Sequence, residues 1–147
     1  MRPINEMKMT LESRSVNESF ARTAVAAFAA QLDPTVEEIN DIKTAVSEAV
    51  TNCIVHAYRE RVGLIYITAA ICDGGLVRVR IRDRGCGIPD VHKAMEPLYT
   101  TLGGERSGLG FTVMESFSDR VRVRSTPGKG TSVVIEKRIR GRQECHG

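Results

Sequence analysis

Residues 76–87 read Leu-Val-Arg-Val-Arg-Ile-Arg-Asp-Arg-Gly-Cys-Gly, an alternating segment that ends in a glycine-rich turn. Successive side chains of a strand point to opposite faces, so the segment separates two chemistries. One face carries three aliphatic residues and a terminal carboxylate: Val77, Val79, Ile81 and Asp83. The other carries three arginines: Arg78, Arg80 and Arg82. The pattern predicts a strand with one buried face, at whose end a carboxylate needs a hydrogen-bond donor.

Two hairpins are predicted around this strand. The segment from Leu64 to Ile71 precedes it and is joined to it by Asp73-Gly74-Gly75, a connection typical of a hairpin. Near the C-terminus, Val121 to Arg124 and Thr131 to Ile135 flank a turn that contains Pro127, Gly128 and Gly130. These residues predict the second hairpin.

Helices are predicted upstream of and between the hairpins. Ser15-Val16-Asn17-Glu18 and Thr35-Val36-Glu37-Glu38 are capping-box patterns. Each precedes apolar residues at helical spacing, which predicts helices over 16–32 and 36–57. Shorter helical patterns follow over Val91 to Met95 and, after a polar stretch, from Gly108 to Phe117.

We therefore expect an α/β protein: a two-layer sandwich of a mixed, mostly antiparallel sheet with helices on one face. Length and composition suit one domain, which we place at residues 1–137, followed by a basic, frayed tail over 138–147. With no tryptophan, the core would use aliphatic residues and four phenylalanines: Phe20, Phe28, Phe111 and Phe117.

Charge and cysteine content narrow the function classes. A net charge of +3 is too small to indicate nucleic-acid binding. The four cysteines lack C-x-x-C spacing and are interpreted as reduced thiols. No apolar run approaches the length of a membrane span, and no export signal is evident, so we expect a cytoplasmic protein without membrane contact.

Polar residues on the second helix form a candidate site. Residues four apart lie on one side of a helix, so Glu48, Asn52 and His56 form a row along the border of its apolar face. A carboxylate and an amide in such a row can act on one ligand. Two plainer roles remain open, an exposed carboxylate for Glu48 and a polar border residue for Asn52, while His56 is interpreted as structural.

Asp83 and the glycines after it form a second candidate site. An Asp two residues before a glycine often makes an Asx turn. Alternatively, the carboxylate could accept a hydrogen bond from the exocyclic amine of adenine, while Gly85 and Gly87 would let a flat ligand approach the backbone.

A third candidate lies at Ser107-Gly108-Leu109-Gly110, which precedes a helix and offers free backbone N–H groups to a phosphate. Arg106 adjoins this turn and could contact a terminal phosphate. Taken alone, the glycines could simply allow a tight turn, and the arginine could be solvated.

Together these motifs resemble those of the GHKL ATPase/kinase superfamily. Residues 48–52 resemble its N box, 83–87 its G1 box, 107–110 its G2 box and 128–131 its last glycine motif. Within the superfamily, the chain resembles the anti-sigma F factors of spore-forming bacteria, a family of serine protein kinases. Four segments carry that likeness: Asn17 to Arg22, Gln31 to Thr35, Ser47 to Asn52 and Glu105 to Gly108.

The resemblance implies a Bergerat-type fold and a set of residue roles. Asp83 would bind adenine with support from Thr131, Asn52 would hold magnesium, and Glu48 would be the catalytic base. The segment from Pro97 to Ser107 would be the ATP lid. The ATP-binding residues implied in addition lie in the boxes and the lid: Gly85, Gly87, Thr101, Arg106, Ser107, Gly108, Leu109 and Gly110.

The resemblance also implies partners. Arg22 would contact a sigma factor, the active form would be a homodimer, and the substrate would be a serine of an anti-anti-sigma protein. The sigma factor would be that of sporulation, sigma F, held away from its polymerase. A stress-response sigma factor, a non-catalytic ATP-gated binding module and a nucleic-acid binder are the alternatives, and we expect no direct contact with nucleic acid. The arginine rows have no counterpart in the resemblance and lead us to expect acidic neighbours or an acidic partner.

Overall fold

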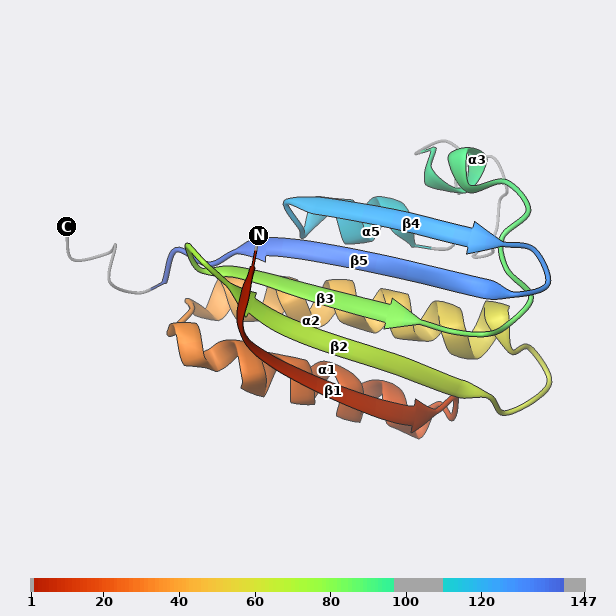
Figure 1. Ribbon diagram of the computed structural model, residues 1–147, viewed down its shortest axis with the longest axis horizontal. Helices are drawn as coiled ribbons and strands as arrows, with labels where there is room; N and C mark the ends of the chain where they lie inside the picture. Colours follow the sequence, from red (N-terminus) through yellow and green to blue (C-terminus); the bar gives the residue numbers. More distant parts are fainter. Residues whose placement is uncertain (1, 97–109, 142–147) are drawn as a thin grey trace.

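The computed structural model describes residues 2–96 and 110–141 and contains a single five-stranded sheet (Figure 1). The strand order is β1-β2-β3-β5-β4, and all four neighbouring pairs are antiparallel. The strands are β1 (Pro3–Glu12), β2 (Leu64–Cys72), β3 (Leu76–Arg82), β4 (Arg120–Thr126) and β5 (Gly130–Arg138). The predicted α/β sandwich and both hairpins are confirmed, whereas the described sheet has no parallel pair.

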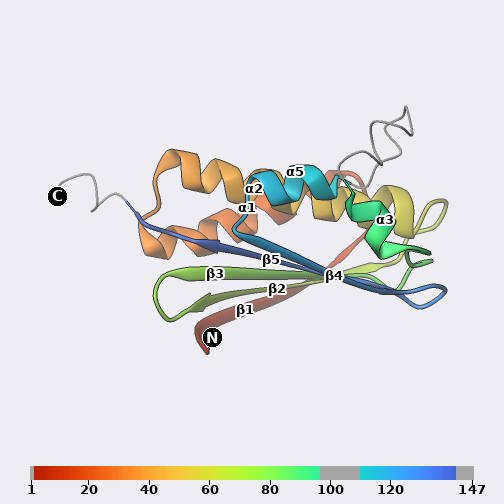
Figure 2. The same ribbon diagram turned by 90° about the horizontal axis from the view of Figure 1, so that it is seen from above.

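The helices lie on one face of the sheet, as Figure 2 shows with the sheet seen edge-on. They are α1 (Val16–Ala29), α2 (Val36–Thr51), α3 (Val91–Met95) and α5 (Phe111–Ser116). A 3₁₀ turn (Ala30–Leu32) follows α1, and a π-helical turn (Asn52–Ala57) follows α2. Among the described residues, no helix is long and apolar enough to cross a membrane.

The core lies between the helices and the inner face of the sheet. The predicted apolar row of β3 is buried there and packs with residues of α2 and β5, among them Val46, Val50 and Ile135. Each such aliphatic side chain contributes about 1.5–3 kcal/mol by leaving water. The phenylalanine prediction is only partly right, because Phe111 is buried but Phe20 is 57% exposed.

Strand β1 was not predicted from the sequence. Its inner face is formed by Met7, Met9 and Leu11, which alternate with exposed residues and pack against the core. This short alternation has no turn motif beside it to mark it as a strand. Pairing with β2 gives β1 its backbone hydrogen bonds and extends the sheet by one strand.

The two predicted capping boxes differ in outcome. At Thr35, both reciprocal bonds are present, because its hydroxyl accepts from the Glu38 N–H at 3.1 Å and its own N–H donates to Glu38 at 2.9 Å. At Ser15 the box prediction is wrong, since that residue has helical dihedral angles and its side chain makes no cap bond. The carboxylate of Glu18 accepts hydrogen bonds from Arg22 and Ser47 instead.

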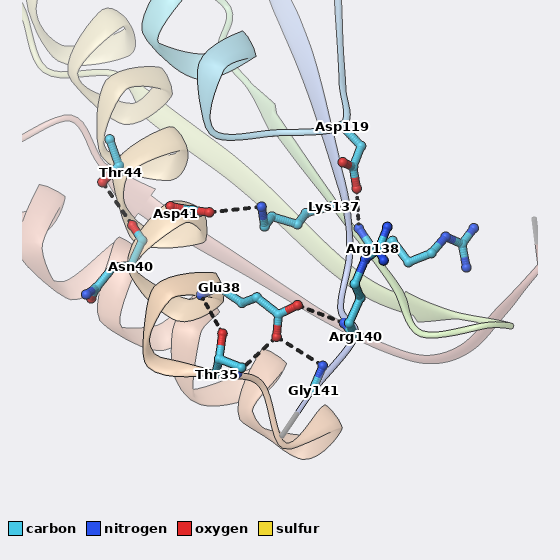
Figure 3. Close-up of polar contacts among 10 residues, drawn as sticks. All are labelled: Thr35, Glu38, Asn40, Asp41, Thr44, Asp119, Lys137, Arg138, Arg140 and Gly141. Carbon is cyan, nitrogen blue, oxygen red and sulfur yellow. Dashed lines mark hydrogen bonds and ion pairs between the residues drawn. The ribbon is translucent and has the colours of Figure 1, made fainter. Parts of the chain in front are cut away.

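The prediction of a frayed tail from residue 138 is wrong for residues 138–141. Strand β5 continues to Arg138, and the side chain of Ile139 is buried. Glu38 accepts hydrogen bonds from the backbone N–H groups of Arg140, at 2.8 Å, and Gly141, at 3.1 Å (Figure 3). The capping carboxylate of α2 therefore also anchors the end of the chain, a tertiary contact that local composition cannot reveal. Residues 142–147 lie outside the described residues.

Replacing Glu38 by alanine is expected to lower the free energy of unfolding at pH 7 by about 2 kcal/mol, the sum of a lost cap and lost tail bonds. Burial raises the pKa of Glu38, but the bonds from Thr35, Arg140 and Gly141 outweigh it, so the pKa lies below its ordinary value. This stabilisation is present above the unfolded pKa of about 4.3 and is lost as pH falls through the folded pKa.

Urea unfolding at pH 7 and at pH 3 measures this effect. The difference between the wild type and Glu38→Ala should shrink at the lower pH. Glu37→Ala, in the same helical turn but exposed, serves as the control and should change stability far less. An equal loss in both variants would contradict the anchoring role of Glu38.

Candidate functional site

A cavity of about 550 Å³ lies beside the C-terminal end of α2. Its walls come from α2 and its π-helical turn, the ends of β3 and β5, α3, and the first residue of α5. The polar and charged side chains that line it are Asn52, His56, Arg59, Asp83, Asp90, Lys93 and Thr131. Apolar groups, including Ala49, Ile81, Ile88 and Phe111, complete the wall. A cavity with apolar walls and a few polar groups suits a small ligand with one flat apolar part.

Asp83 is buried at the end of β3 and lines this cavity. Its Oδ1 accepts hydrogen bonds from the N–H of Gly85, at 2.9 Å, and from the N–H of Thr131, at 3.2 Å. The Cys53 thiol contacts Oδ2 at 3.6 Å. The Asx turn is thus present, and Thr131 supports the carboxylate through its backbone. Because the described residues offer Oδ2 only the weak thiol donor, it can accept a further hydrogen bond from a ligand.

The two glycines of the turn are required by the protein's own backbone. A Cβ on Gly85 would overlap the carbonyl group of Ala57. Gly87 has φ of 78° and lies equally close to the backbone of Thr126. Only Gly87 of the two lines the cavity. Close approach of neighbouring chain segments is therefore one reason for both glycines, and ligand approach to the backbone stays a prediction.

The polar row on α2 is interrupted by the π-helical turn. Regular α2 ends at Thr51, and the Tyr58 N–H bonds the carbonyl of Cys53, five residues back, at 3.1 Å. Asn52 and His56 both line the cavity. The pKa of His56 is lowered by burial and by the charge of Arg59, which favours the neutral imidazole. A π-helical turn shifts the following residues around the axis, which i,i+4 reasoning did not foresee.

Glu48 lies one helical turn before Asn52 but does not line the cavity formed by the described residues. Its half-buried carboxylate lies against Gly110, where a Cβ would overlap Oε1. Gly110 has φ of 70° and is the N-cap of α5. Burial and the negative charge of Glu18 raise the pKa of Glu48. The carboxylate is thus held beside the start of α5, in surroundings that raise its basicity.

Two residues that sequence reasoning missed hold the turn after β3. The Tyr58 hydroxyl accepts from the Arg84 N–H and donates to the Leu64 carbonyl, both at 2.6 Å. Ser125 accepts from the Ile88 N–H at 2.7 Å. A lone tyrosine after a helix and a serine within a strand carry no local signal for this role.

The remaining predicted site residues are placed as follows. Arg22 lies on α1, outside the cavity, and its guanidinium pairs with Glu18 at 2.9 Å. Glu18 also accepts from Ser47, which precedes Glu48. Five predicted residues fall within 97–109, outside the described residues: Thr101, Arg106, Ser107, Gly108 and Leu109.

The chain matches the model of the histidine kinase-like ATPase domain over residues 10–137. The chain belongs to this family. Membership implies ATP binding.

Curated relatives place the chain more finely within the family. The anti-sigma F factor of Caldanaerobacter subterraneus subsp. tengcongensis is 61% identical over 136 residues, 92% of this chain and 94% of the relative. The anti-sigma F factor of Clostridium acetobutylicum is 53% identical, covering 92% of this chain and 94% of the relative. That of Geobacillus kaustophilus is 52% identical, covering 92% of this chain and 93% of the relative. The chain therefore belongs to the anti-sigma F factor family, as the resemblance predicted.

Solved structures support the same fold. The RsbU and RsbW domains of a Mycobacterium tuberculosis protein match with a TM-score of 0.69 at 23% identity, covering 93% of this chain and 33% of that one. The mycobacterial sensor histidine kinase MprB matches with a TM-score of 0.57 at 15% identity, covering 92% of this chain and all of that one. The identities are low, so these likenesses establish the fold alone.

Proposed function

We propose that the chain sequesters the sporulation sigma factor F and uses Mg-ATP to phosphorylate a serine of an anti-anti-sigma protein. The observation that carries the proposal is that Asp83 and Asn52 line the same cavity, while Glu48 lies one helical turn before Asn52. The identity to anti-sigma F factors over most of the chain supports the choice of partners.

The cavity fits the adenine end of a nucleotide. The Oδ2 atom of Asp83 would accept from the adenine amine, while Ile81, Ile88 and Ala94 pack against the ring. Specificity for the amine follows from a buried carboxylate, because a ligand without that donor would leave an acceptor unpaired.

The described residues suit a magnesium ion that is bound mainly through phosphates. They contain no group of three His, Cys, Asp or Glu side chains able to hold a metal. Magnesium commonly takes one or two protein oxygens and completes its shell with phosphate and water oxygens. The Asn52 amide oxygen, at the cavity wall, is the protein ligand we assign.

Glu48 would act as the base for the serine hydroxyl. When bound, Mg-ATP supplies the γ-phosphoryl group and neutralises the charge that develops on it. The carboxylate of Glu48 would orient the hydroxyl and take its proton as the new bond forms. Because its pKa is raised, it is a stronger base than an exposed glutamate.

Replacing Glu18 by glutamine is expected to shift the acidic limb of the transfer profile to lower pH. Transfer should rise with pH as Glu48 ionises, and removal of the Glu18 charge should lower the pKa of Glu48. The measurement is kcat/KM between pH 5 and 8. Glu18→Asp keeps the charge and should leave the limb near its wild-type position. If the acidic limb does not move in Glu18→Gln, the limb does not report the ionisation of Glu48.

Arg22 is the residue we assign to sigma capture. Its guanidinium is part-exposed on α1 and is oriented by Glu18, which leaves further donors for an acidic group of the sigma factor. We expect Arg22→Ala to weaken sigma binding about tenfold or more, with ATP affinity unchanged. Co-elution of sigma at several concentrations measures the loss, and Arg61→Ala, at an exposed arginine outside α1, is the control. Undiminished co-elution would remove Arg22 from the interface.

A reconstituted system tests the function as a whole. The chain, which we expect to be a homodimer, is mixed with sigma factor F, the antagonist protein and Mg-ATP. Sigma should stay bound when the antagonist carries a phosphoserine and should be released when its serine is replaced by alanine. Capture without any phosphorylation of the antagonist would favour an ATP-gated binding module. Selective capture of a stress-response sigma factor would reassign the partner.

A further inference from the structure

The face of the sheet opposite the helices carries a trough between two rows of arginines. Register places Val134 of β5 opposite Arg80 of β3 on one side and Arg122 of β4 on the other. Two residues along, the small side chain of Ser132 lies between a second pair of arginines in the same way. The members of this arginine trough are Arg80, Arg82, Arg122, Arg124, Ser132 and Val134. Figure 2 shows that the described helices all lie on the other side of the sheet.

The dimensions of the trough follow from sheet geometry. Neighbouring strands lie about 4.8 Å apart, so the arginine rows on β3 and β4 are about 10 Å apart with β5 as the floor. Within one row, arginines two residues apart are separated by about 6.8 Å. All four arginines are exposed, which leaves their guanidinium groups accessible from the open side.

One end of the trough contains charge that the described residues do not neutralise. At the other end, Glu136 pairs with Arg78 at 3.0 Å and contacts Arg122 at 3.7 Å. Among residues 2–96 and 110–141, no carboxylate forms an ion pair with Arg82, Arg84 or Arg124. These three and Lys129 line a hollow of about 390 Å³ beside Ser132. The hollow is also lined by Asp83, whose Oδ1 accepts from the backbone N–H groups of Gly85 and Thr131.

The arginines at this end are partly preorganised. The guanidinium groups of Arg82 and Arg84 lie 4.9 and 5.0 Å from the ring centre of Tyr66, which restricts their orientation. Arg80 donates to the Ser132 hydroxyl at 3.4 Å. A guanidinium held in place loses less entropy when it binds a carboxylate with two parallel hydrogen bonds.

We propose that the arginine trough binds an extended acidic segment of a protein partner, with acidic side chains at alternate positions. In an extended chain, side chains two residues apart are separated by the same 6.8 Å or so as the arginines of one row. The segment would lie over Ser132 and Val134, with its acidic side chains all on the side that faces the sheet, where they reach the guanidinium groups of both rows. Glu136 repels carboxylates at one end, so the acidic positions should fall nearer to Arg82 and Arg124.

Two other occupants fit the surface less well. A nucleic-acid strand would need exposed aromatic rings for base stacking. Among the described residues the ring on this face is that of Tyr66, which two guanidinium groups already contact. A second copy of the chain, packed through the same face, would bring arginine rows against each other. The arginine trough is separate from the proposed sigma contact at Arg22, and its test requires neither ATP nor sigma.

Fluorescence anisotropy with a labelled peptide of alternating glutamate and serine tests the proposal on the full chain. The double variant Arg80→Gln/Arg124→Gln should weaken binding about tenfold or more at low salt. Ser132→Glu, which places a carboxylate on the trough floor, should weaken it as well. Arg120→Gln is the matched control, because Arg120 is on the same face of β4 but opposite Glu136, and it should change affinity less than about threefold. Circular dichroism verifies that each variant is folded.

Three results would overturn the proposal. The first is unchanged peptide affinity in both trough variants. The second is binding of a thymidine oligonucleotide, or of a peptide with the same glutamates in one block, as tightly as the alternating peptide. Either would indicate unspecific attraction of polyanions. The third is self-association that light scattering detects for the wild type but not for the double variant. This result would assign the face to a second copy of the chain.

Discussion

Replacing Glu48 by glutamine should reduce phosphoryl transfer by about 10²–10⁴-fold while ATP affinity stays within about threefold of the wild type. The amide has the same shape as the carboxylate but cannot take the proton of the serine hydroxyl. Glu48 lies beside Gly110 rather than on the cavity wall, so its loss should not disturb the adenine end. Single-turnover transfer and calorimetric ATP titration measure the two quantities.

A matched control and a clear contradiction exist for Glu48→Gln. Glu37→Gln makes the same chemical change on an exposed turn of the same helix and should leave transfer unaffected. If Glu48→Gln transfers phosphate at the wild-type rate, Glu48 is not the base. If transfer and ATP affinity fall together, Glu48 instead supports nucleotide binding.

Replacing Asp83 by asparagine should weaken ATP binding by about 100-fold without unfolding the chain. The amide oxygen can still accept from the N–H groups of Gly85 and Thr131, so the turn should persist. The amide nitrogen would then stand where Oδ2 now faces the cavity, and two donors would oppose each other at the adenine amine. Inosine triphosphate, which presents an acceptor there, should lose far less affinity than ATP.

Titration calorimetry with both nucleotides measures this exchange of preference. Cys53→Ala is the control, because it removes the thiol at Oδ2 but keeps the carboxylate, and it should still prefer ATP. A folded Asp83→Asn protein with wild-type ATP affinity would place adenine elsewhere. Equal losses for both nucleotides would indicate that Asp83 supports the turn without contacting the base.

Strongly patterned elements of the fold were predictable from sequence. β3 alternates fully and has a glycine-rich turn on each side, so its buried face and the position of Asp83 at its end follow from periodicity. β1 has the same alternation over only three apolar positions without a turn beside it, and it becomes a strand because β2 offers an edge. Ser15 has the sequence of a cap, but the Glu18 carboxylate accepts from Arg22 and Ser47 instead.

The sequence predicted which residue types form the candidate site but not how these residues are arranged. Spacing on a helix brought Glu48 and Asn52 together, yet it could not foresee the π-helical turn or the position of Glu48 against Gly110. The contacts of Tyr58 and Ser125 with the turn after β3 join segments far apart in the chain. Such contacts depend on tertiary packing, which no local pattern encodes.

Mapping of transferred phosphate tests the central claim most directly. The chain is incubated with γ-labelled Mg-ATP and the anti-anti-sigma protein, and the labelled residue is identified by peptide mass spectrometry beside a parallel Glu48→Gln reaction. The proposed function predicts a single labelled serine on the partner with the wild type and almost none with the variant. A label on a histidine of the chain itself, or no label on the partner despite tight ATP binding, would contradict it.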